Sequence, residues 1–280
     1  MQYETTWSRL LQEAVNRPGI VSEAYRTFHG YSVGNQLLAM LQCHERGIPP
    51  GPINTYPGWQ KLGRQVKRGE KAITLCMPVT EKKRKPKIDA AALRTASFTG
   101  KEESQVEPEP EAKVEEYSRY FVYRPHWFVL AQTEGEEFKY PELPDWSKDR
   151  ALSTLNIREV PFDWPDGNTL GYASGRDIAV SPLSPLPYRT LFHEVGHVEL
   201  RHTDRSLTDG PQLSRSLREA EAESVALLCL ETLGLDGGPY ARGYIQSWLA
   251  GETIPEKSAQ KIFAAADRIL RAGSKSGGGG

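Results

Sequence analysis

The residues best suited to chemistry lie in the string TLFHEVGHVELRH, residues 190–202. His193 and His197 are four residues apart, so on a helix both imidazoles lie on one face and can reach one metal ion at roughly 2.0–2.1 Å. Glu194 follows the first histidine, where its carboxylate can meet a water at the metal instead of the metal itself. This pattern is typical of metal-assisted hydrolysis, with His193 and His197 as zinc ligands and Glu194 as general base.

A charged surface helix is the alternative explanation of so short a pattern. However, the flanking residues Leu191, Phe192, Val195 and Val198 are apolar, as in a buried helix. Strands precede the helix, and carboxylates suited to a third ligand follow it. We therefore interpret the string as a zinc site.

The third ligand decides the class of zinc site. The metzincin pattern requires Gly and His at positions where this chain has Leu200 and Thr203. His202 is one position off, with a different helical phase, and we expect it not to bind the metal. Two histidines, one carboxylate and a water would leave the open position of a catalytic site.

Carboxylates in the following segment, RSLREAEAESVALLCL, offer the third ligand. Glu219 and Glu223 share one face of the expected helix, and Glu221 points about 160° away from them. An acidic surface stripe is the alternative, but the apolar residues 225–228 indicate a core helix. The segment resembles the ExEA(D/N/E) helix of Glu-ligand (gluzincin-type) zincins. That resemblance implies that Glu219 is the ligand and that Glu223 orients a histidine, with Glu223 as the fallback ligand.

Charge is distributed unevenly along the 280 residues, although the net charge is only −1. Residues 1–88 hold 14 Lys and Arg against 6 Asp and Glu, and residues 89–116 hold 3 against 8. A basic N-terminal third followed by an acidic segment favours a polyanionic partner. The 38% of hydrophobic residues are enough for a sizeable core in one or two domains.

The cysteines and the apolar runs bear on the compartment. Cys43, Cys76 and Cys229 form no CxxC pair, so neither a disulfide framework nor a cysteine zinc site is expected. The first residues lack the pattern of a signal peptide, and no apolar run approaches the length of a membrane span. We expect a cytoplasmic protein with no membrane partner.

Periodicity predicts an α+β fold with two domains. Residues 1–140 should form a small α+β domain with helices at 5–16 and 32–46, strands at 72–77 and 120–132, and a disordered insertion at about 81–116. Residues 141–273 should form a second α+β domain, and 274–280 a flexible tail. Its expected elements are a helix at 147–155, strands near 157–160, 169–173 and 177–180, and helices at 188–201, 213–233, 239–250 and 256–271.

Two further features of the second domain could serve a peptide substrate. The strand at 176–181 is expected to lie along the cleft and to hold an extended peptide by β-augmentation. Tyr240 and Tyr244 could donate to an oxyanion, but aromatic packing in the core is their expected role.

The basic N-terminal part interleaves aromatic and cationic residues, for example Tyr31, Trp59, Arg64 and Lys67. Cations that follow phosphates, with aromatic rings for unstacked bases, are typical of single-strand binding. The alternative is a solvated charged face over aromatic core residues.

Several strings resemble the ArdC-type antirestriction family. FHGYSVGNQLLAMLQ, YPGWQKLGRQVKRGEKAI and WFVLAQTEG are similar to its N-terminal single-stranded-DNA-binding domain. GYASGRDIAVSP, the HEVGH helix and the EAEAE helix are similar to its zincin-like metallopeptidase domain. The resemblance implies a protein of mobile elements that coats incoming single-stranded DNA and counters restriction. It implies DNA contacts by Tyr31, Ser32, Asn35, Gln36, Trp59, Arg64, Lys67, Arg68 and Lys71.

Three hypotheses follow. The first is a single-stranded-DNA-binding module joined to a zinc peptidase that acts on an unknown protein or peptide. The second is a non-catalytic DNA-binding antirestriction protein whose zinc site is structural or vestigial. The third is a peptidase whose basic domain recognises acidic proteins. The intact Glu194 favours the first, because a structural zinc site needs no base.

Overall fold

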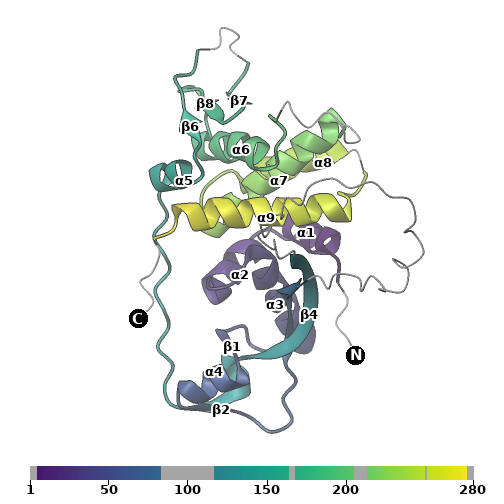
Figure 1. Ribbon diagram of the computed structural model, residues 1–280, viewed down its shortest axis with the longest axis vertical. Coiled ribbons are helices and arrows are strands. Elements are labelled where there is room, and N and C mark those ends of the chain that lie inside the picture. The colour runs from purple at the N-terminus through teal and green to yellow at the C-terminus, as the bar shows by residue number, and fades with distance from the viewer. Residues whose placement is uncertain (1–4, 83–116, 164–167, 205–212, 250, 276–280) are drawn as a thin grey trace, which may run out of the picture. The chain divides into compact units, whose positions relative to one another are not determined.

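The computed structural model describes residues 5–82, 117–163, 168–204, 213–249 and 251–275 (Figure 1). Helices and short strands are mixed, so the α+β prediction is confirmed. The chain forms two compact units, Met1–Leu75 with Pro125–Gly280, and Cys76–Arg124. The domain boundary at residue 140 stays a prediction. The expected insertion at 81–116 lies outside the described residues apart from its first two positions.

Three helices open the larger unit: α1 (Trp7–Asn16), α2 (Ile20–Phe28) and α3 (Val33–Arg46). Side-chain caps define the N-termini of α1 and α3. Thr6 accepts a hydrogen bond from Arg9 N, and Ser32 accepts one from Asn35 N. Helix α3 ends at Gly47, whose φ of 62° lies in the left-handed region that favours glycine. The sequence prediction missed α2, because nine residues are too few for a clear helical period.

Short strands and one helix follow: β1 (Ile53–Thr55), α4 (Tyr56–Lys61), β2 (Arg64–Val66), β3 (Ile73–Lys82), β4 (Tyr117–Val129), the 3-10 helix η2 (Leu130–Gln132) and β5 (Thr133–Gly135). One sheet has the order β1-β4-β3, and β2 pairs with β5 in another. Strand β4 runs antiparallel to β1, with Ile53 opposite Val129. The strand after the insertion therefore lies in the same sheet as the strands before it.

The HExxH helix is preceded by α5 (Lys148–Thr154) and a third sheet of β6 (Arg158–Glu159), β7 (Gly171–Ser174) and β8 (Asp177–Val180). Its order is β6-β8-β7, and the β7–β8 hairpin turns at Gly175, with φ 59°. Strand β8 is therefore the central strand. The expectation that residues 176–181 would receive a peptide is wrong, because both edges of β8 are already paired; β7 is the outer strand.

The C-terminal half is built around one central helix: α6 (Pro187–Glu199), α7 (Arg215–Leu233), α8 (Gly238–Leu249) and α9 (Glu256–Gly273). Helix α7 is buried continuously from Ala220 to Thr232 and packs against α6, α8, α9 and α2. It begins at the cap Ser214 and ends at Gly234, whose φ is 66°. Because α7 is packed on all sides, its rotation is fixed, and each side chain along it points towards a defined neighbour.

Polar contacts connect the first helices to the last. Glu256 accepts hydrogen bonds from the amides of Trp7 (3.1 Å) and Ser8 (2.9 Å) at the start of α1. Asp267 accepts one from Val33 N (2.8 Å) at the start of α3. Helix α9 thus supplies carboxylates to two helix N-termini that lie far away in the sequence.

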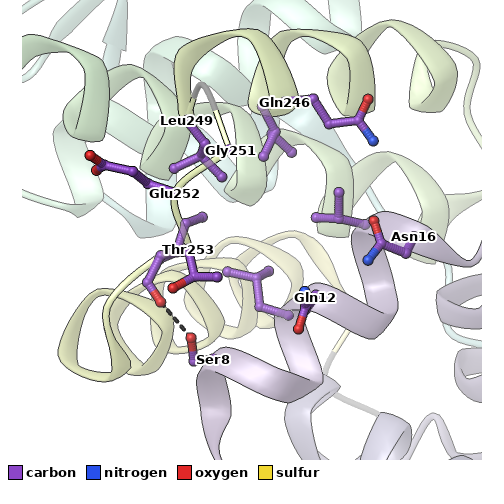
Figure 2. A pocket seen from close by; sticks show the side chains of 12 residues that line it. Ser8, Gln12, Asn16, Gln246, Leu249, Gly251, Glu252 and Thr253 are labelled. Atoms are coloured by element: carbon purple, nitrogen blue, oxygen red, sulfur yellow. Dashed lines mark hydrogen bonds between the residues drawn. The ribbon is translucent and has the colours of Figure 1, made fainter.

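A cavity of about 200 Å³ lies between α1, α8 and the segment before α9 (Figure 2). Its wall includes Leu11, Val15, Ile245 and Leu249, and Glu252 is its one titratable residue. This cavity therefore offers no set of metal-binding groups. Among the described residues, no helix combines the length and apolarity needed to cross a membrane.

Candidate metal centre

Helix α6 carries the HExxH residues on a face that is partly open. Pro187 occupies its first turn, where the missing N–H costs nothing. Leu191, Phe192 and Val195 are at most 3% exposed and anchor the opposite side in the core. At Gly196 the helix approaches α7 so closely that an added Cβ would lie 3.2 Å from Ala222 O. This close approach brings the polar face of α6 next to the start of α7.

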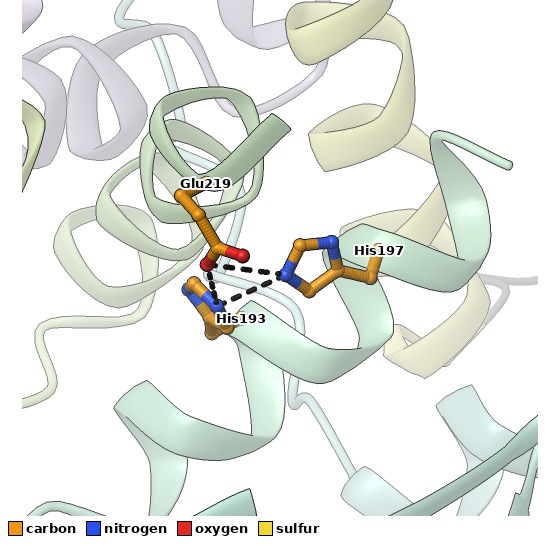
Figure 3. Close-up of side chains that lie close together, drawn as sticks. All are labelled: His193, His197 and Glu219. Carbon is orange, nitrogen blue, oxygen red and sulfur yellow. Dashed lines mark hydrogen bonds and ion pairs between the residues drawn. The ribbon is translucent and has the colours of Figure 1, made fainter. Parts of the chain in front are cut away.

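Two histidines of α6 and one glutamate of α7 converge (Figure 3). The Nε2 atoms of His193 and His197 are 3.1 Å apart. Glu219 Oε2 lies 3.3 Å from the first of these nitrogens and 3.6 Å from the second. Within the described part of the chain, this is the group of His, Cys, Asp and Glu side chains that could hold a metal ion.

Glu223, the fallback ligand, lies behind the cluster. Its Oε2 is 2.9 Å from His193 Nδ1, the ring nitrogen that faces away from Glu219. Arg189 donates to both oxygens of Glu223, at 2.7 and 3.0 Å, and its guanidinium lies 4.4 Å from the ring centre of Tyr244. Glu223 is thus fully engaged outside the cluster. The sequence analysis missed Arg189, although it lies one helical turn before His193.

His197 also has an outer contact. Its Nδ1 is 2.9 Å from Nδ1 of His202, and Nε2 of His202 is 2.8 Å from Glu221 Oε2. Neither His202 nor Glu221 belongs to the convergent group. The sequence analysis considered both residues only as candidate ligands and missed their contact, because the chain reverses direction between α6 and α7.

Glu194 is 7% exposed and lies at the wall of the cluster. Strand β7 contacts it, since a Cβ at Gly171 would lie 2.9 Å from Glu194 Oε1. Burial raises the pKa of Glu194 to about 7, against the opposing effect of His193. The carboxyl group can therefore exchange a proton near neutral pH.

Charge in the cluster is biased towards the negative. Burial lowers the pKa of His193, but hydrogen bonds with Glu219 and Glu223 outweigh it and raise this pKa to about 9. Hydrogen bonds from His193 and His197 lower the pKa of Glu219. The cluster consequently has a strong affinity for positive charge.

A cavity of about 380 Å³ opens onto the cluster. Its wall comprises the three convergent residues with Gly171, Ala173, Glu194, His202, Thr203, Arg215 and Arg218. The outer strand β7 thus borders the same space as the donors. Tyr240 and Tyr244 are 65% and 51% exposed, so their expected packing in the core is wrong.

Several residues expected to touch DNA are used inside the fold. Trp59 is 1% exposed and donates its indole N–H to Phe128 O at 2.8 Å. Gln36 is 2% exposed and donates to Tyr31 O, and the Tyr31 hydroxyl donates to Ile53 O. The buried rings and amides thus lie in the core beside the first sheet.

The remaining candidates form two groups. Ser32 caps α3, and Asn35 is half-buried in its first turn. Arg64 donates through Nε to Thr133 Oγ1 at 2.8 Å and connects β2 to β5. The exposed cations are Lys67, Arg68 and Lys71. Tyr56, 39% exposed, is an aromatic residue of the same segment that the sequence analysis missed.

Comparison with known proteins supports the family resemblance. Residues 2–123 match the family model described as the N-terminal domain of anti-restriction factor ArdC. The metal-free crystal structure of antirestriction protein ArdC from plasmid R388 is 19% identical and covers 95% of this chain and 94% of that one, with a TM-score of 0.49. Its Mn(II)-bound structure is 21% identical and covers 94% and 98%, with a TM-score of 0.46. No curated protein matches the sequence.

The family match includes the helices α1 to α4 and the strands β1 to β3 described above. Residues 2–123 of the chain are therefore similar to the N-terminal domain of ArdC.

Proposed function

We propose that the protein is a cytoplasmic, zinc-dependent peptide hydrolase joined to a single-stranded-DNA-binding part, and that it acts in antirestriction. The observation that carries the hydrolase proposal is the convergence of His193, His197 and Glu219 beside the buried Glu194. The match of residues 2–123 to the ArdC N-terminal domain supports the DNA-binding and antirestriction parts. A Mn(II)-bound structure exists for the R388 ArdC protein, which supports a metal-binding role.

The donor atoms fit a zinc ion. Atoms bound to one tetrahedral ion at roughly 2.0–2.1 Å lie about 3.3 Å apart. The observed separations of the two Nε2 atoms and Glu219 Oε2 are 3.1, 3.3 and 3.6 Å. Two imidazoles and one carboxylate are a ligand set of catalytic zinc sites. We therefore assign Glu219 as the third ligand and Glu223 as the residue that orients His193.

Glu194 supplies the proton chemistry in this proposal. When bound, zinc polarises a substrate carbonyl and makes a water more acidic. Glu194 accepts the proton of the attacking water and passes it to the leaving amine, which suits a carboxyl group with a pKa of about 7. Gly171 leaves room for this carboxylate, because an added Cβ would lie only 2.9 Å from Glu194 Oε1.

The substrate is proposed to bind along β7. This strand is the outer one of its sheet, and Gly171 and Ala173 line the cavity at the metal cluster. An extended peptide can add to such an edge through main-chain hydrogen bonds. A peptide added to β7 at Gly171 and Ala173 would lie beside the donor atoms, because these residues line the same cavity. Hydrolysis of the peptide backbone requires this proximity.

Single-stranded DNA is proposed to bind through the exposed cations of residues 61–71. Lys67, Arg68 and Lys71 are exposed, and the exposed ring of Tyr56 lies at the start of α4, the helix that precedes them. Cations of this kind bind phosphates, and a ring can stack on an unpaired base. We leave Trp59 and Gln36 out of the proposed interface because both side chains are buried.

Comparison of the wild type with Glu194→Gln tests the hydrolase proposal. We expect about one equivalent of zinc in both proteins, and loss of peptide cleavage by roughly 10²–10⁴-fold in the variant. Cleavage would be followed by sequencing new protein N-termini in cells that express each form, with and without incoming single-stranded DNA. Glu252→Gln, in the cavity of Figure 2, serves as the control acid and should cleave like the wild type.

Two outcomes would contradict the proposal in different ways. Less than about half an equivalent of zinc in the wild type would remove the ligand assignment. A full equivalent of zinc with no new N-termini in the wild type would favour a non-catalytic antirestriction protein. Equal cleavage by Glu194→Gln and wild type would show that Glu194 is not the base.

A further inference from the structure

We propose that His202 and Glu221 are positioning residues that keep His197 in the tautomer able to bind a metal through Nε2. This inference rests on the proposed function, because it concerns the same metal centre. It assigns a role to two residues outside the donor group and explains why the chain reverses sharply after α6.

The three side chains form one continuous chain of hydrogen bonds. His197 Nδ1 lies 2.9 Å from His202 Nδ1, and His202 Nε2 lies 2.8 Å from Glu221 Oε2. The side chains of His202 and Glu221 are only 5% and 1% exposed. Water therefore competes little for these contacts, and the positions of the protons along the chain follow from the three groups themselves.

Glu221 determines which atom donates and which accepts in each of these hydrogen bonds. A carboxylate only accepts, so His202 Nε2 carries the donated proton. Neutral His202 then has a lone pair on Nδ1, which accepts a hydrogen bond from Nδ1–H of His197. His197 is left with its lone pair on Nε2, the atom that faces His193 and Glu219. The reverse arrangement would place a proton on Nε2 and prevent it from binding a metal.

The backbone turn directly after α6 places His202 beside His197. Arg201, directly after α6, has a φ of 62°, in a region where non-glycine residues are uncommon. The turn lets His202 N donate to His197 O at 2.8 Å, so the two residues are joined by their backbones and their rings. Arg201 N also donates to Val198 O at 3.0 Å, so the two bonds form a Schellman cap at the end of α6. This cap places His202 directly beside the last turn of the helix.

Glu221 is both buried and charged. The residue is 0% exposed; burial opposes its ionised form, but hydrogen bonds with His202 and Ser258 outweigh burial and lower its pKa. A buried ion pair can often be replaced by apolar residues at little cost to stability. The contact of Glu221 with His202 gives it a use at the metal centre. Both proposed ligand histidines then have an outer acidic partner, Glu223 directly for His193 and Glu221 through His202 for His197.

The test measures zinc affinity by competition with a chelator, using the full chain. His202→Ala should raise the zinc Kd by about 10–100-fold, the usual effect of losing an outer partner of a ligand histidine. His202→Gln should stay within about threefold of the wild type, because its amide oxygen can accept from His197 and its amide N–H can donate to Glu221. Glu221→Leu should raise the zinc Kd about tenfold without lowering the urea midpoint measured in excess chelator.

Arg268→Ala is the matched control. Arg268 donates to the carboxylate (2.7 Å) and to the carbonyl (2.9 Å) of Glu199 at the end of α6, so the variant loosens the same part of the helix without touching the histidines. Its zinc Kd should remain within about twofold of the wild type. A loss equal to that of His202→Ala would mean that any disturbance of this helix end weakens the site, and it would overturn the inference.

Imidazole ¹⁵N NMR of the metal-free protein gives a readout independent of affinity. His197 should show a protonated Nδ1 and an unprotonated Nε2 in the wild type and in His202→Gln, and a mixture of the two tautomers in His202→Ala. Equal zinc affinity of His202→Ala and wild type, or equal weakening by His202→Ala and His202→Gln, would overturn the positioning role. Failure of the wild type itself to bind zinc would instead overturn the proposed metal centre.

Discussion

The metal cluster on α6 and α7 and the basic segment at residues 61–71 use their polar side chains in opposite ways. In the cluster, His193, His197 and Glu219 turn towards one another, and outer residues support them. In the basic segment, Arg68 is exposed and Arg64 donates to a main-chain carbonyl, whereas Lys67 is exposed and also donates to Ala131 O. Convergence marks a site for a small cation, whereas a row of exposed charges suits an extended polyanion.

The free energy of unfolding distinguishes side chains that belong to the core from side chains that are free to bind a ligand. Trp59→Ala should lower it by about 3–5 kcal/mol, because the substitution empties a core position and leaves Phe128 O without its donor. Urea denaturation measures the loss. If Trp59→Ala were neutral for stability but weakened binding of oligo-dT, Trp59 would be a DNA contact.

Zinc should have the next largest effect, and only through the cluster. Free zinc at 100 times its Kd should raise the free energy of unfolding by about 2.7 kcal/mol in the wild type. Glu219→Ala should remove this increment, because one of the three donors is lost. Thermal unfolding with and without chelator measures both. An undiminished increment in Glu219→Ala, together with its loss in Glu223→Ala, would make Glu223 the third ligand.

Asp267 lies outside both regions, and its buried carboxylate on α9 accepts from Val33 N on α3. Burial raises its pKa from 3.8 to about 6, so the folded protein binds the proton more tightly than the unfolded chain. Stability from this group is therefore present at low pH and is lost as pH rises from about 4 to about 6. Asp267→Asn should be more stable than wild type by on the order of 2 kcal/mol above pH 6, and equal to it near pH 4. A difference independent of pH would contradict this account.

Gly196 tests how closely the helices of the cluster must approach. Gly196→Ala should cost about 1–2 kcal/mol and weaken zinc binding, because its Cβ would crowd Ala222 O and Val225. Gly243→Ala in α8 is the matched control, since nothing lies within 4 Å of the added Cβ. The control should be neutral or slightly stabilising, because alanine favours the helix. Equal losses in both variants would show that the helix spacing is not critical.

The exposed cations should matter least for stability and most for DNA. Replacing Lys67, Arg68 and Lys71 by alanine together should change the free energy of unfolding by less than about 0.5 kcal/mol. The salt dependence of oligo-dT binding should become shallower by about two, since each phosphate contact contributes roughly 0.7 to the slope. An unchanged slope would place the DNA elsewhere.

Helical spacing predicted that the two histidines lie on one face, whereas the choice of Glu219 over Glu223 came from the resemblance to Glu-ligand zincins. An interval of four residues on an apolar helix leaves His193 and His197 on one face whatever the surrounding fold. The contacts of His202 and Glu221 were not predictable in this way, because they depend on the backbone reversal at Arg201.

The basic segment shows the opposite case. The same residue types serve as core, as main-chain donors or as free charges, and only burial distinguishes Trp59 from Tyr56. The order of strands in the third sheet likewise depended on a parallel pair, β6 with β8, that joins segments separated by a hairpin strand. Local patterns therefore predicted the elements well but not the partners of each strand.

The contact of Glu256 with the first turn of α1 has a consequence for synthesis on the ribosome. The N-terminal helices emerge first, yet the carboxylate that caps α1 belongs to a residue 249 positions later than Trp7. Leu10 and Leu11 are 1% exposed in the finished fold, in a helix that packs against α9. The nascent chain therefore lacks both this cap and the packing of α1 against α9 until almost all of the protein has been translated, so its early helices expose apolar surface that chaperones bind.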